Sequence, residues 1–486
     1  MVSLANLFEG AKDLPIERLM MDSRVAAPNS IFFCMKGLKN DGHHFIDMAI
    51  SNGAICIVHS DPVETFREGI VYIKVENVVD VLNRVADAFY GRPSGKLNVI
   101  GVTGTNGKST IALTIKNILN AYMPTGYIGT ISIEYGDVKT LPLLTTPEIT
   151  QLHEILADMV DKGVKAVSLE VSSQGLEQAR VNVVEFDTAI FTNLTHDHLD
   201  YHGTMENYFQ AKSKLFNLIG PDKTAIINID DPYGRRLEQA CSARVVTYAI
   251  NTPATYMAKN IEILFDRTNF DLHLYNEIYP VQTNMVAMFN VYNLLAVIAA
   301  CHENGMPMEV ILERCKKIEH VDGRMERIEE GQNFQVIVDY AHTPDGFEKI
   351  FKFADDITPK GKRILAVFGA AGKRDTKKRP ILGEIADRFC DMIILTEEDP
   401  RNELPHAIAE QIAKGITKSN YSIVEDRYDA IRQALEMANE GDTVLILAKG
   451  DESYMYREFG REDWIGDDNA VREILREVVL IKEENQ

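Results

Sequence analysis

Short apolar runs alternate with longer amphipathic segments along most of the chain. Near the N-terminus, the runs Ile31–Phe33 and Ala54–Val58 alternate with helix-like segments that end at Ala86–Tyr90. Apolar runs of this length, interleaved with helices, are typical of a parallel sheet with helices packed on it. The pattern therefore predicts a small α/β domain in residues 1–95.

The same alternation resumes after Gly91–Lys96, a segment rich in turn-forming residues that we interpret as a linker. We expect a strand over Leu97–Val102, then a glycine-rich loop and a helix from Thr110 to about Ala121. Further strand-like runs follow at Ala166–Glu170, Thr188–Phe191 and Thr224–Asn228. This part of the chain, residues 96–322, is predicted to form a mainly parallel sheet with helices on both faces.

A third series of apolar runs predicts a third α/β domain over residues 323–486, with its boundary near Asp322–Arg324. The runs that carry this prediction are Val336–Asp339, Arg363–Phe368, Met392–Leu395 and Thr443–Ala448. Their alternation with helical segments is the pattern of another parallel sheet.

The composition narrows the functions that such domains can have. The chain has 486 residues, of which 45% are hydrophobic and 25% charged, and its formal net charge is -21. An acidic protein without basic patches is not expected to bind nucleic acid or an anionic membrane surface. Small anionic ligands remain compatible, because a local group of cations and backbone N–H groups can hold a phosphate.

The cysteines and the N-terminus indicate where the protein works. The six cysteines are scattered without a CxxC pair, which disfavours a zinc site and a disulfide framework. The N-terminal segment has no basic region followed by an apolar stretch, and no apolar run approaches about 18 residues. We therefore expect a cytoplasmic protein that is not inserted in a membrane.

The segment Gly101–Thr110 has the parts of a phosphate-binding loop, although its spacing differs by one residue. The strict motif requires a glycine at position 102, where this chain has Val102. Such a loop needs glycines for the turn, a lysine for the phosphates and a hydroxyl for magnesium, all of which are present. The residues that we expect to bind the nucleotide are Gly104, Thr105, Asn106, Gly107, Lys108, Ser109 and Thr110.

Two later segments carry groups that suit a divalent metal ion. Glu170 ends an apolar strand, and nucleotide enzymes use such a second-strand carboxylate to hold magnesium. The loop Asn193–Gly203 contains three histidines, His196, His198 and His202. Zinc is an alternative for these histidines, but the absence of a nearby cysteine and the intermixed carboxylates favour magnesium.

The segment TGTNGKST, at Thr103–Thr110, resembles the ATP loop of the Mur ligase superfamily. Within that superfamily, the chain is most similar to the MurE type, the UDP-N-acetylmuramoyl-tripeptide synthetases. The resemblance runs from Asp22–Arg24 to Lys449–Tyr454. It implies an α/β enzyme of three domains: a small N-terminal UDP-binding domain, a central P-loop-type ATPase domain and a C-terminal Rossmann-like domain that binds the amino acid. It also implies ATP and Mg²⁺ as cofactors.

The resemblance assigns roles to individual residues of this sequence. It implies that Lys108 is catalytic together with three magnesium ligands, Glu170, His198 and a carbamylated Lys212, and that Ser109 is a further ligand. A carbamate turns a lysine into an anion and forms only on a neutral amine, which burial beside the metal would favour by lowering the lysine pKa. The further nucleotide contacts that it implies are Asn290, Arg324, Asp339 and His342. The implied substrate contacts are Ser23 on the uridine side, together with Thr145, Thr146, Ser172, Gln178 and Arg180 at the muramoyl peptide, and Arg374.

The third domain is expected to select the incoming amino acid. Similar enzymes that add meso-diaminopimelate carry the motif Asp-Asn-Pro-Arg, where this chain has Glu398-Asp399-Pro400-Arg401. Arg401 would hold the distal carboxylate of diaminopimelate through a bidentate pair. Asp399, and the altered motif that ends in Glu452, would instead favour the bare distal ammonium of lysine. The expectation leans slightly to diaminopimelate because of Arg401, with lysine as the alternative.

The expected activity is an ATP-dependent amide ligation in peptidoglycan biosynthesis. ATP would phosphorylate the γ-carboxylate of UDP-N-acetylmuramoyl-L-alanyl-D-glutamate, and the amine of the diamino acid would displace the phosphate. The expected partners are these two substrates, and the protein is expected to be a monomer. A folylpolyglutamate synthase is one alternative, which normally lacks the separate N-terminal domain. A non-catalytic ATP-binding subunit is the other, against which the retained Lys108, Glu170, His198 and Lys212 count.

Overall fold

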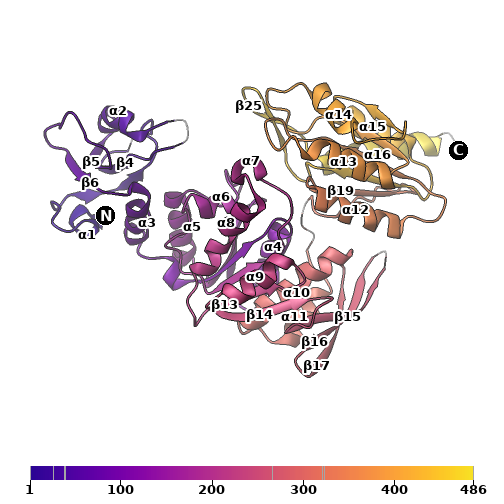
Figure 1. Cartoon of the computed structure of the whole chain (residues 1–486), viewed down its shortest axis with the longest axis horizontal. Helices are drawn as coiled ribbons and strands as arrows, with labels where there is room; N and C mark the ends of the chain where they lie inside the picture. The colour runs from indigo at the N-terminus through magenta and orange to yellow at the C-terminus, as the bar shows by residue number, and fades with distance from the viewer. Residues whose placement is uncertain are drawn as a thin grey trace.

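The computed structural model of the chain describes residues 2–25, 27–37, 40–264, 266–319, 321 and 323–484. Three α/β lobes follow one another along the chain, drawn in indigo, purple to pink, and orange to yellow in Figure 1. The predicted class, three α/β domains with a mainly parallel central sheet, is confirmed. Asp322, at which we placed the second boundary, lies outside the described residues.

The N-terminal lobe is a parallel sheet with the strand order β3-β4-β5-β6. Its inner strands are almost fully buried, since helices α1 and α3 cover one face and α2 the other. The strands are β3 (Arg18–Met20), β4 (Ser30–Phe33), β5 (Ala54–His59) and β6 (Val71–Lys74), with a short antiparallel pair, β1 (Val2–Ser3) and β2 (Pro15–Ile16). The helices are α1 (Leu4–Leu7), η1 (Gly42–Phe45), α2 (Ile46–Ser51) and α3 (Val78–Phe89).

The central lobe is built on a sheet with the order β10-β9-β8-β11-β7-β12-β13-β14-β15-β16-β17, parallel from β8 to β15. Helices α4, α10 and α11 pack on one face, and α5, α6, α8 and α9 pack on the other. The helices are α4 (Lys108–Leu119), α5 (Ile149–Asp161), α6 (Ser173–Glu177), α7 (Leu199–His202), α8 (Met205–Asn217), α9 (Pro232–Ala240), α10 (Met288–Glu303) and α11 (Met308–Cys315). The strands of the parallel part are β7 (Asn98–Thr103), β8 (Thr125–Ile128), β11 (Ala166–Glu170), β12 (Thr188–Phe191), β13 (Thr224–Asn228), β14 (Arg244–Ala249) and β15 (Tyr256–Ile263).

Antiparallel strands extend this sheet at both edges, which the sequence analysis did not predict. They are β9 (Ile133–Tyr135), β10 (Val138–Thr140), β16 (Thr268–Leu274) and β17 (Glu277–Thr283). In β16, buried residues alternate with half-buried ones, as expected for a strand that is covered on one face. A search for continuous apolar runs misses such strands, because their hydrophobic residues occur at every second position.

The C-terminal lobe has the strand order β18-β19-β23-β20-β21-β22, with β18 antiparallel and the remaining neighbours parallel. Helices α12, α13 and α14 cover one face, and α15 and α16 the other. The strands are β18 (Glu326–Arg327), β19 (Gln335–Asp339), β20 (Ile364–Phe368), β21 (Met392–Leu395), β22 (Tyr421–Ile423) and β23 (Thr443–Leu447), followed by the hairpin β24 (Tyr454–Arg457) and β25 (Gly460–Asp463). The helices are α12 (Pro344–Ile357), α13 (Lys378–Phe389), α14 (Pro405–Ala413), α15 (Arg427–Met437) and α16 (Asp467–Glu484).

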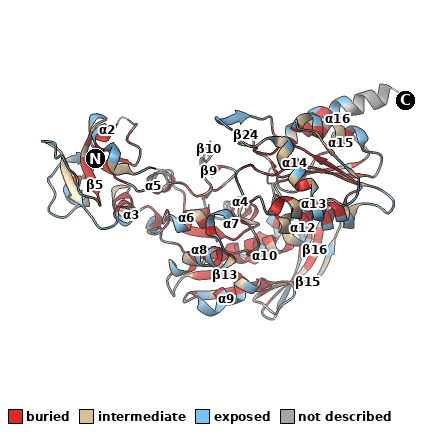
Figure 2. Cartoon of the chain, turned by 45° about the horizontal axis from the view of Figure 1, so that its top comes forward, coloured by how far each residue is buried: buried red, intermediate tan, exposed pale blue. Residues whose placement is uncertain are grey.

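The buried residues are concentrated in the sheets and on the helix faces that pack against them. Figure 2 shows buried residues along the strands and on the inner sides of the helices. In a parallel sheet, the loops at the carboxyl ends of neighbouring strands share one edge, so the segments after β7, β11 and β12 lie together. Among the described residues, no helix has both the length and the apolar character needed to cross a membrane.

Candidate active site

The glycine-rich loop forms the turn between β7 and α4. Gly107 has a φ of 90°, in the left-handed region that favours glycine, and caps the N-terminus of α4. A Cβ atom on Gly104 would lie 1.8 Å from the hydroxyl oxygen of Thr192, so the close approach of β12 requires a glycine there. The loop is also held by Asn193, whose side-chain oxygen accepts the N–H of Asn106 at 3.0 Å. The altered spacing is therefore compatible with the strand-loop-helix geometry that presents N–H groups to a phosphate.

Lys108, the first residue of α4, folds its side chain back over this loop. Its Nζ donates to the carbonyl oxygens of Gly104, at 3.1 Å, and Thr105, at 2.9 Å. Burial lowers the pKa of Lys108 below its ordinary value, although the carboxylates of Glu170 and Asp197 oppose this shift. An ammonium held by carbonyl oxygens in a cavity is well placed to receive an anionic ligand.

Glu170, at the end of β11, gathers hydroxyl groups around a fully buried carboxylate. Its Oε2 accepts the hydroxyl of Ser109 at 2.9 Å, and its Oε1 accepts the hydroxyl of Tyr127 at 2.6 Å. The backbone N–H of Thr130 also donates to Oε1, at 2.9 Å. Carboxylate and hydroxyl oxygens are the ligands that Mg²⁺ prefers, so this donor set fits the predicted ion.

Lys212 reaches the same loop from α8 and is almost completely buried. Its Nζ donates to the carbonyl oxygen of Gly104 at 2.7 Å and lies 4.7 Å from the centre of the Tyr208 ring. Burial lowers the pKa of Lys212 well below its ordinary value, and the nearby charge of Lys108 lowers it further. This shift favours the neutral amine that carbamylation requires.

The three histidines of the loop after β12 do not converge on one point. The Nε2 of His196 lies 2.7 Å from the carboxylate of Asp375, and the Nε2 of His202 lies 2.9 Å from the hydroxyl of Ser173. His198 faces the cavity beside Asp197, and burial lowers its pKa to about 4, which favours the neutral imidazole. The described residues of this loop thus offer no three-histidine zinc cluster, and His198 alone fits a role at the phosphate loop.

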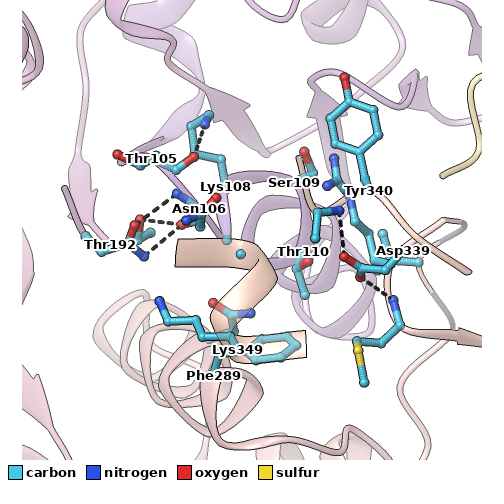
Figure 3. Close-up of a pocket in the computed structure, with 18 of the residues that line it drawn as sticks. Thr105, Asn106, Lys108, Ser109, Thr110, Thr192, Phe289, Asp339, Tyr340 and Lys349 are labelled. Atoms are coloured by element: carbon cyan, nitrogen blue, oxygen red, sulfur yellow. Dashed lines mark hydrogen bonds between the residues drawn. The ribbon is translucent and has the colours of Figure 1, made fainter. Parts of the chain in front are cut away.

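The C-terminal lobe closes the nucleotide side of the cavity. Asp339 ends β19 and accepts the N–H groups of Met325 and Ala341, both at 2.7 Å, which fixes the turns on either side of the strand. The guanidinium of Arg324 lies 4.3 Å from the centre of the Tyr340 ring. Figure 3 shows Asp339 and Tyr340 around the same cavity as the loop residues Thr105 to Thr110.

Two contacts tie the central and C-terminal lobes together at this cavity. The side-chain amide of Asn106 donates to Asp345 at 2.8 Å, and His196 pairs with Asp375 across the lobes. The cavity has a volume of about 1290 Å³. The predicted residues that line it are Thr105, Asn106, Gly107, Lys108, Ser109, Thr110, Thr145, Glu170, Ser172, Arg180, His198, Lys212, Asn290, Arg324, Asp339, His342, Arg374 and Glu452.

Other predicted residues do not line the cavity. Ser23 lies in the N-terminal lobe, where its hydroxyl contacts the sulfur of Met48. Thr146 is fully buried and donates to the carbonyl oxygen of Glu170, so it supports the end of β11. Gln178 accepts a hydrogen bond from Arg180 at 2.5 Å and orients that cavity residue. Gly104, Asp399 and Arg401 also lie outside the cavity lining, and Gly104 contributes its carbonyl oxygen to both lysines.

Arg401 lies outside the cavity lining, in the turn after β21. Its Nη1 donates to the carbonyl oxygen of Gly372 at 2.6 Å, and its backbone N–H donates to the carbonyl oxygen of Tyr456 at 2.8 Å. The guanidinium lies 5.4 Å from the centre of the Tyr456 ring. Arg401 therefore connects the turn after β21 to the hairpin β24–β25.

Several residues of the site were not predicted. Asp197 lies between His196 and His198 in the sequence. Burial opposes ionisation of its carboxyl, but His198, His342 and Lys378 hold the pKa of that carboxyl below the usual range. Its position between two histidines was a local signal that could have identified it. Tyr127 had no such signal, because its contact with Glu170 joins residues from separate strands.

Comparison with known protein families covers nearly the whole chain. Residues 15–90 match the profile described as Mur ligase family, catalytic domain, residues 102–301 match the Mur ligase middle domain, and residues 323–450 match the Mur ligase, glutamate ligase domain. A curated relative from Geobacillus thermodenitrificans is 41% identical over 448 residues, covering 90% of this chain and 91% of the relative. Another, from Alkaliphilus metalliredigens, is 40% identical over 96% of this chain and 95% of its own. Both relatives are named UDP-N-acetylmuramoyl-L-alanyl-D-glutamate--2,6-diaminopimelate ligase.

A solved structure of an enzyme with that same name is similar to this chain, with a TM-score of 0.70 and 28% identity over 99% of both chains. The Mycobacterium tuberculosis folylpolyglutamate synthase shares the fold, with a TM-score of 0.64, but covers 76% of this chain at 16% identity. The chain belongs to the Mur ligase family.

Proposed function

We propose that this protein is the ATP-dependent ligase that joins 2,6-diaminopimelate to UDP-N-acetylmuramoyl-L-alanyl-D-glutamate. One observation carries the proposal: the phosphate loop with Lys108 and the amino-acid end with Arg374 and Glu452 line the same cavity. A ligase of this kind must hold ATP, an acceptor carboxylate and an amine within reach of one another. The names of the relatives at about 40% identity support the same reaction.

The phosphate loop supplies the first step. Lys108 and the loop N–H groups would hold the β- and γ-phosphates of ATP and stabilise the charge that develops as the γ-phosphoryl group moves. The acceptor carboxylate attacks the γ-phosphorus, the bond to the β-phosphate oxygen breaks, and ADP leaves. The amine of the amino acid then attacks the acyl carbon, and inorganic phosphate leaves with the bonding electron pair.

We propose that Ser109, Glu170, His198 and a carbamylated Lys212 hold Mg²⁺ beside this loop. The ion would offset negative charge on the phosphates. Ser109 and Glu170 are already within hydrogen-bond distance, and the neutral amine of Lys212 lies against the same loop at the carbonyl of Gly104. A carbamate on Lys212 would add the anionic oxygen ligand that the amine itself lacks.

Arg180, Ser172 and Thr145 are proposed to hold the muramoyl dipeptide. Arg180 is fixed by the carbonyl oxygen of Thr146 at 2.9 Å and by Glu148 at 3.1 Å, so its orientation does not depend on a ligand. We propose that residues 1–95 form a UDP-binding domain, with Ser23 at the uridine end. Residues 96–322 would bind ATP, and residues 323–486 would bind the amino acid. We further propose a cytoplasmic monomer.

The test is release of phosphate from ATP with the UDP-muramoyl dipeptide and a panel of amino acids. We expect release with diaminopimelate, slower release with lysine, and none without the dipeptide. Product mass identifies the new amide bond. Phosphate release with a reduced folate and glutamate would support the folylpolyglutamate alternative instead, which the relatives do not favour. ATP binding without any turnover would favour a non-catalytic subunit.

A further inference from the structure

Lys449 lies under the amino-acid end of the cavity and is fully buried. Its Nζ donates to Asp399 at 2.8 Å and to Glu452 at 2.6 Å, so one ammonium joins two carboxylates. The Nζ also lies 5.0 Å from the centre of the Tyr454 ring. Lys449 therefore connects the turn after β21, the turn after β23 and the start of the hairpin β24–β25.

Both acids have further partners. Asp399 accepts the backbone N–H of Tyr456 at 3.0 Å, and Glu452 accepts the hydroxyls of Tyr340 at 3.0 Å and Tyr454 at 3.3 Å. Burial alone would lower the pKa of Lys449, but Glu452 and Asp399 raise it above its ordinary value, so the ammonium stays charged. The two acids and the lysine together carry one net negative charge, where the acids alone would carry two.

Two arginines share the cavity with Glu452. Arg374 and Arg461 line the same cavity. Arg461 lies 4.1 Å from the centre of the Tyr454 ring and donates to the hydroxyl of Tyr456 at 2.9 Å, which fixes it in place. A ligand in this cavity can therefore meet the carboxylate of Glu452, whose charge Lys449 partly offsets, and the guanidinium groups of two arginines. This is a better match for a distal centre with both an ammonium and a carboxylate than for an ammonium alone.

The geometry points to Lys449 as the residue that sets the choice of amino acid. Lys449 pairs with Asp399 and Glu452 inside the protein, so these two acids are less available to bind a distal ammonium. Lys449 is a positioning residue in this inference, since Glu452 lies between it and the cavity. The inference rests on the proposed function and deepens it. It also explains why an aspartate at position 399 is compatible with a distal carboxylate: its charge is matched from inside the protein.

The experiment is a charge cycle on the two residues, read as the ratio of kcat/KM for diaminopimelate to kcat/KM for lysine. Lys449→Met leaves two unmatched acids, so the ratio should fall about tenfold, in favour of lysine. Asp399→Asn removes one negative charge, so the ratio should rise about tenfold. The double variant Lys449→Met/Asp399→Asn restores the original net charge, and its ratio should return to within about threefold of the unmodified protein.

A purely structural role predicts a different pattern. Loss of packing would lower kcat/KM for both amino acids alike and leave the ratio unchanged in every variant, which would overturn the inference. Arg432→Met is the matched control, because it removes a cation that pairs with Glu477 on the far helices of the same lobe. Failure of the unmodified protein to use either amino acid would overturn the proposed function instead, so the two failures are distinguishable. If Lys449→Met fails to fold, Asp399→Asn alone still tests the inference, because an unchanged ratio would contradict it.

Discussion

Lys212 and Lys449 are both inside the protein, with exposed fractions of 2% and 0%, yet their surroundings are opposite. Lys449 lies between two carboxylates, and its pKa is raised. Lys212 contacts a carbonyl oxygen and a tyrosine ring, and its pKa is well below the ordinary value. Adjacent carboxylates favour the charged form of a buried lysine, as at Lys449, whereas burial with less counter-charge favours the neutral amine, as at Lys212. Lys108 shares the carbonyl contact of Lys212, and burial lowers its pKa too, but the carboxylates of Glu170 and Asp197 oppose that shift.

The largest effect is expected at Lys108, whose side chain lies over the phosphate loop and is held there by the carbonyl oxygens of Gly104 and Thr105. Lys108→Ala should lower ATP turnover by about 10³-fold, because it removes the main cation at the transferring phosphoryl group. Phosphate release measures the effect. Lys116→Ala, on the same helix but paired with Glu134, is the control and should keep most activity. Near-normal turnover of Lys108→Ala would contradict the assignment of the phosphate loop.

The second largest effect is expected at Lys212, and it tests whether the amine of this residue is carbamylated. Lys212→Ala should lower turnover about 100-fold, and added formate or acetate should restore part of it by supplying the missing carboxylate at the metal. Lys214→Ala, on the same helix and paired with Glu177 at the surface, is the matched control. A fully active, magnesium-bound protein whose intact mass shows an unmodified Lys212 would contradict the carbamate proposal.

A smaller effect is expected at Arg401, on the same side of the molecule as Lys449. Arg401→Ala should weaken the use of diaminopimelate by roughly 2 kcal/mol, or about 30-fold, if its guanidinium pairs with the distal carboxylate. The use of lysine should hardly change. Steady-state kinetics with both amino acids measure the difference. Equal losses for both would show that Arg401 acts through its contacts with Gly372 and Tyr456 and not through the ligand.

The smallest effect concerns stability and pH. Since the folded pKa of Lys212 lies below 10.5, Lys212 binds more protons in the unfolded chain between those two values, and its contribution to stability should rise with pH there. The slope is at most about 1.4 kcal/mol per pH unit. Lys449 has the opposite sign, because its pKa is raised: its contribution is complete below 10.5 and is lost at higher pH.

Urea unfolding of the ligand-free protein in CO₂-free buffer, from about pH 8 to pH 10, measures these slopes. Lys212→Met should lower the slope relative to the unmodified protein, whereas Lys449→Met should lower stability and leave the slope unchanged, because Lys449 does not titrate in this range. Some slope remains in every variant, since burial also lowers the pKa of Lys108 and raises the pKa of buried cysteines such as Cys56. Equal slopes for Lys212→Met and the unmodified protein would contradict the contrast between the two lysines.

Much of the fold could be predicted because it is encoded locally. The runs at Ala166–Glu170, Thr188–Phe191 and Thr224–Asn228 are strands with those bounds, since continuous apolar residues bounded by polar ones are what a buried parallel strand requires. Boundaries set by turn geometry were less accurate. We expected the helix after the loop to begin at Thr110, but it begins at Lys108, because Gly107 adopts the left-handed conformation and starts the helix directly.

The candidate site likewise has features that the sequence predicts and features that depend on the tertiary structure. The sequence alone predicts the phosphate loop, the acid that ends β11 and the lysine of α8 as site residues, because each stands in a short segment whose chemistry is visible without its neighbours. Only the tertiary structure decided the charge state and the partners of these groups. Lys212 meets the loop across 108 residues of sequence, and Lys449 meets Asp399 across 50. Such distances depend on how sheets and lobes pack, and it is packing that sets burial and counter-charge. The pKa of a lysine, and hence whether it is a structural cation or a reactive amine, follows from those two quantities.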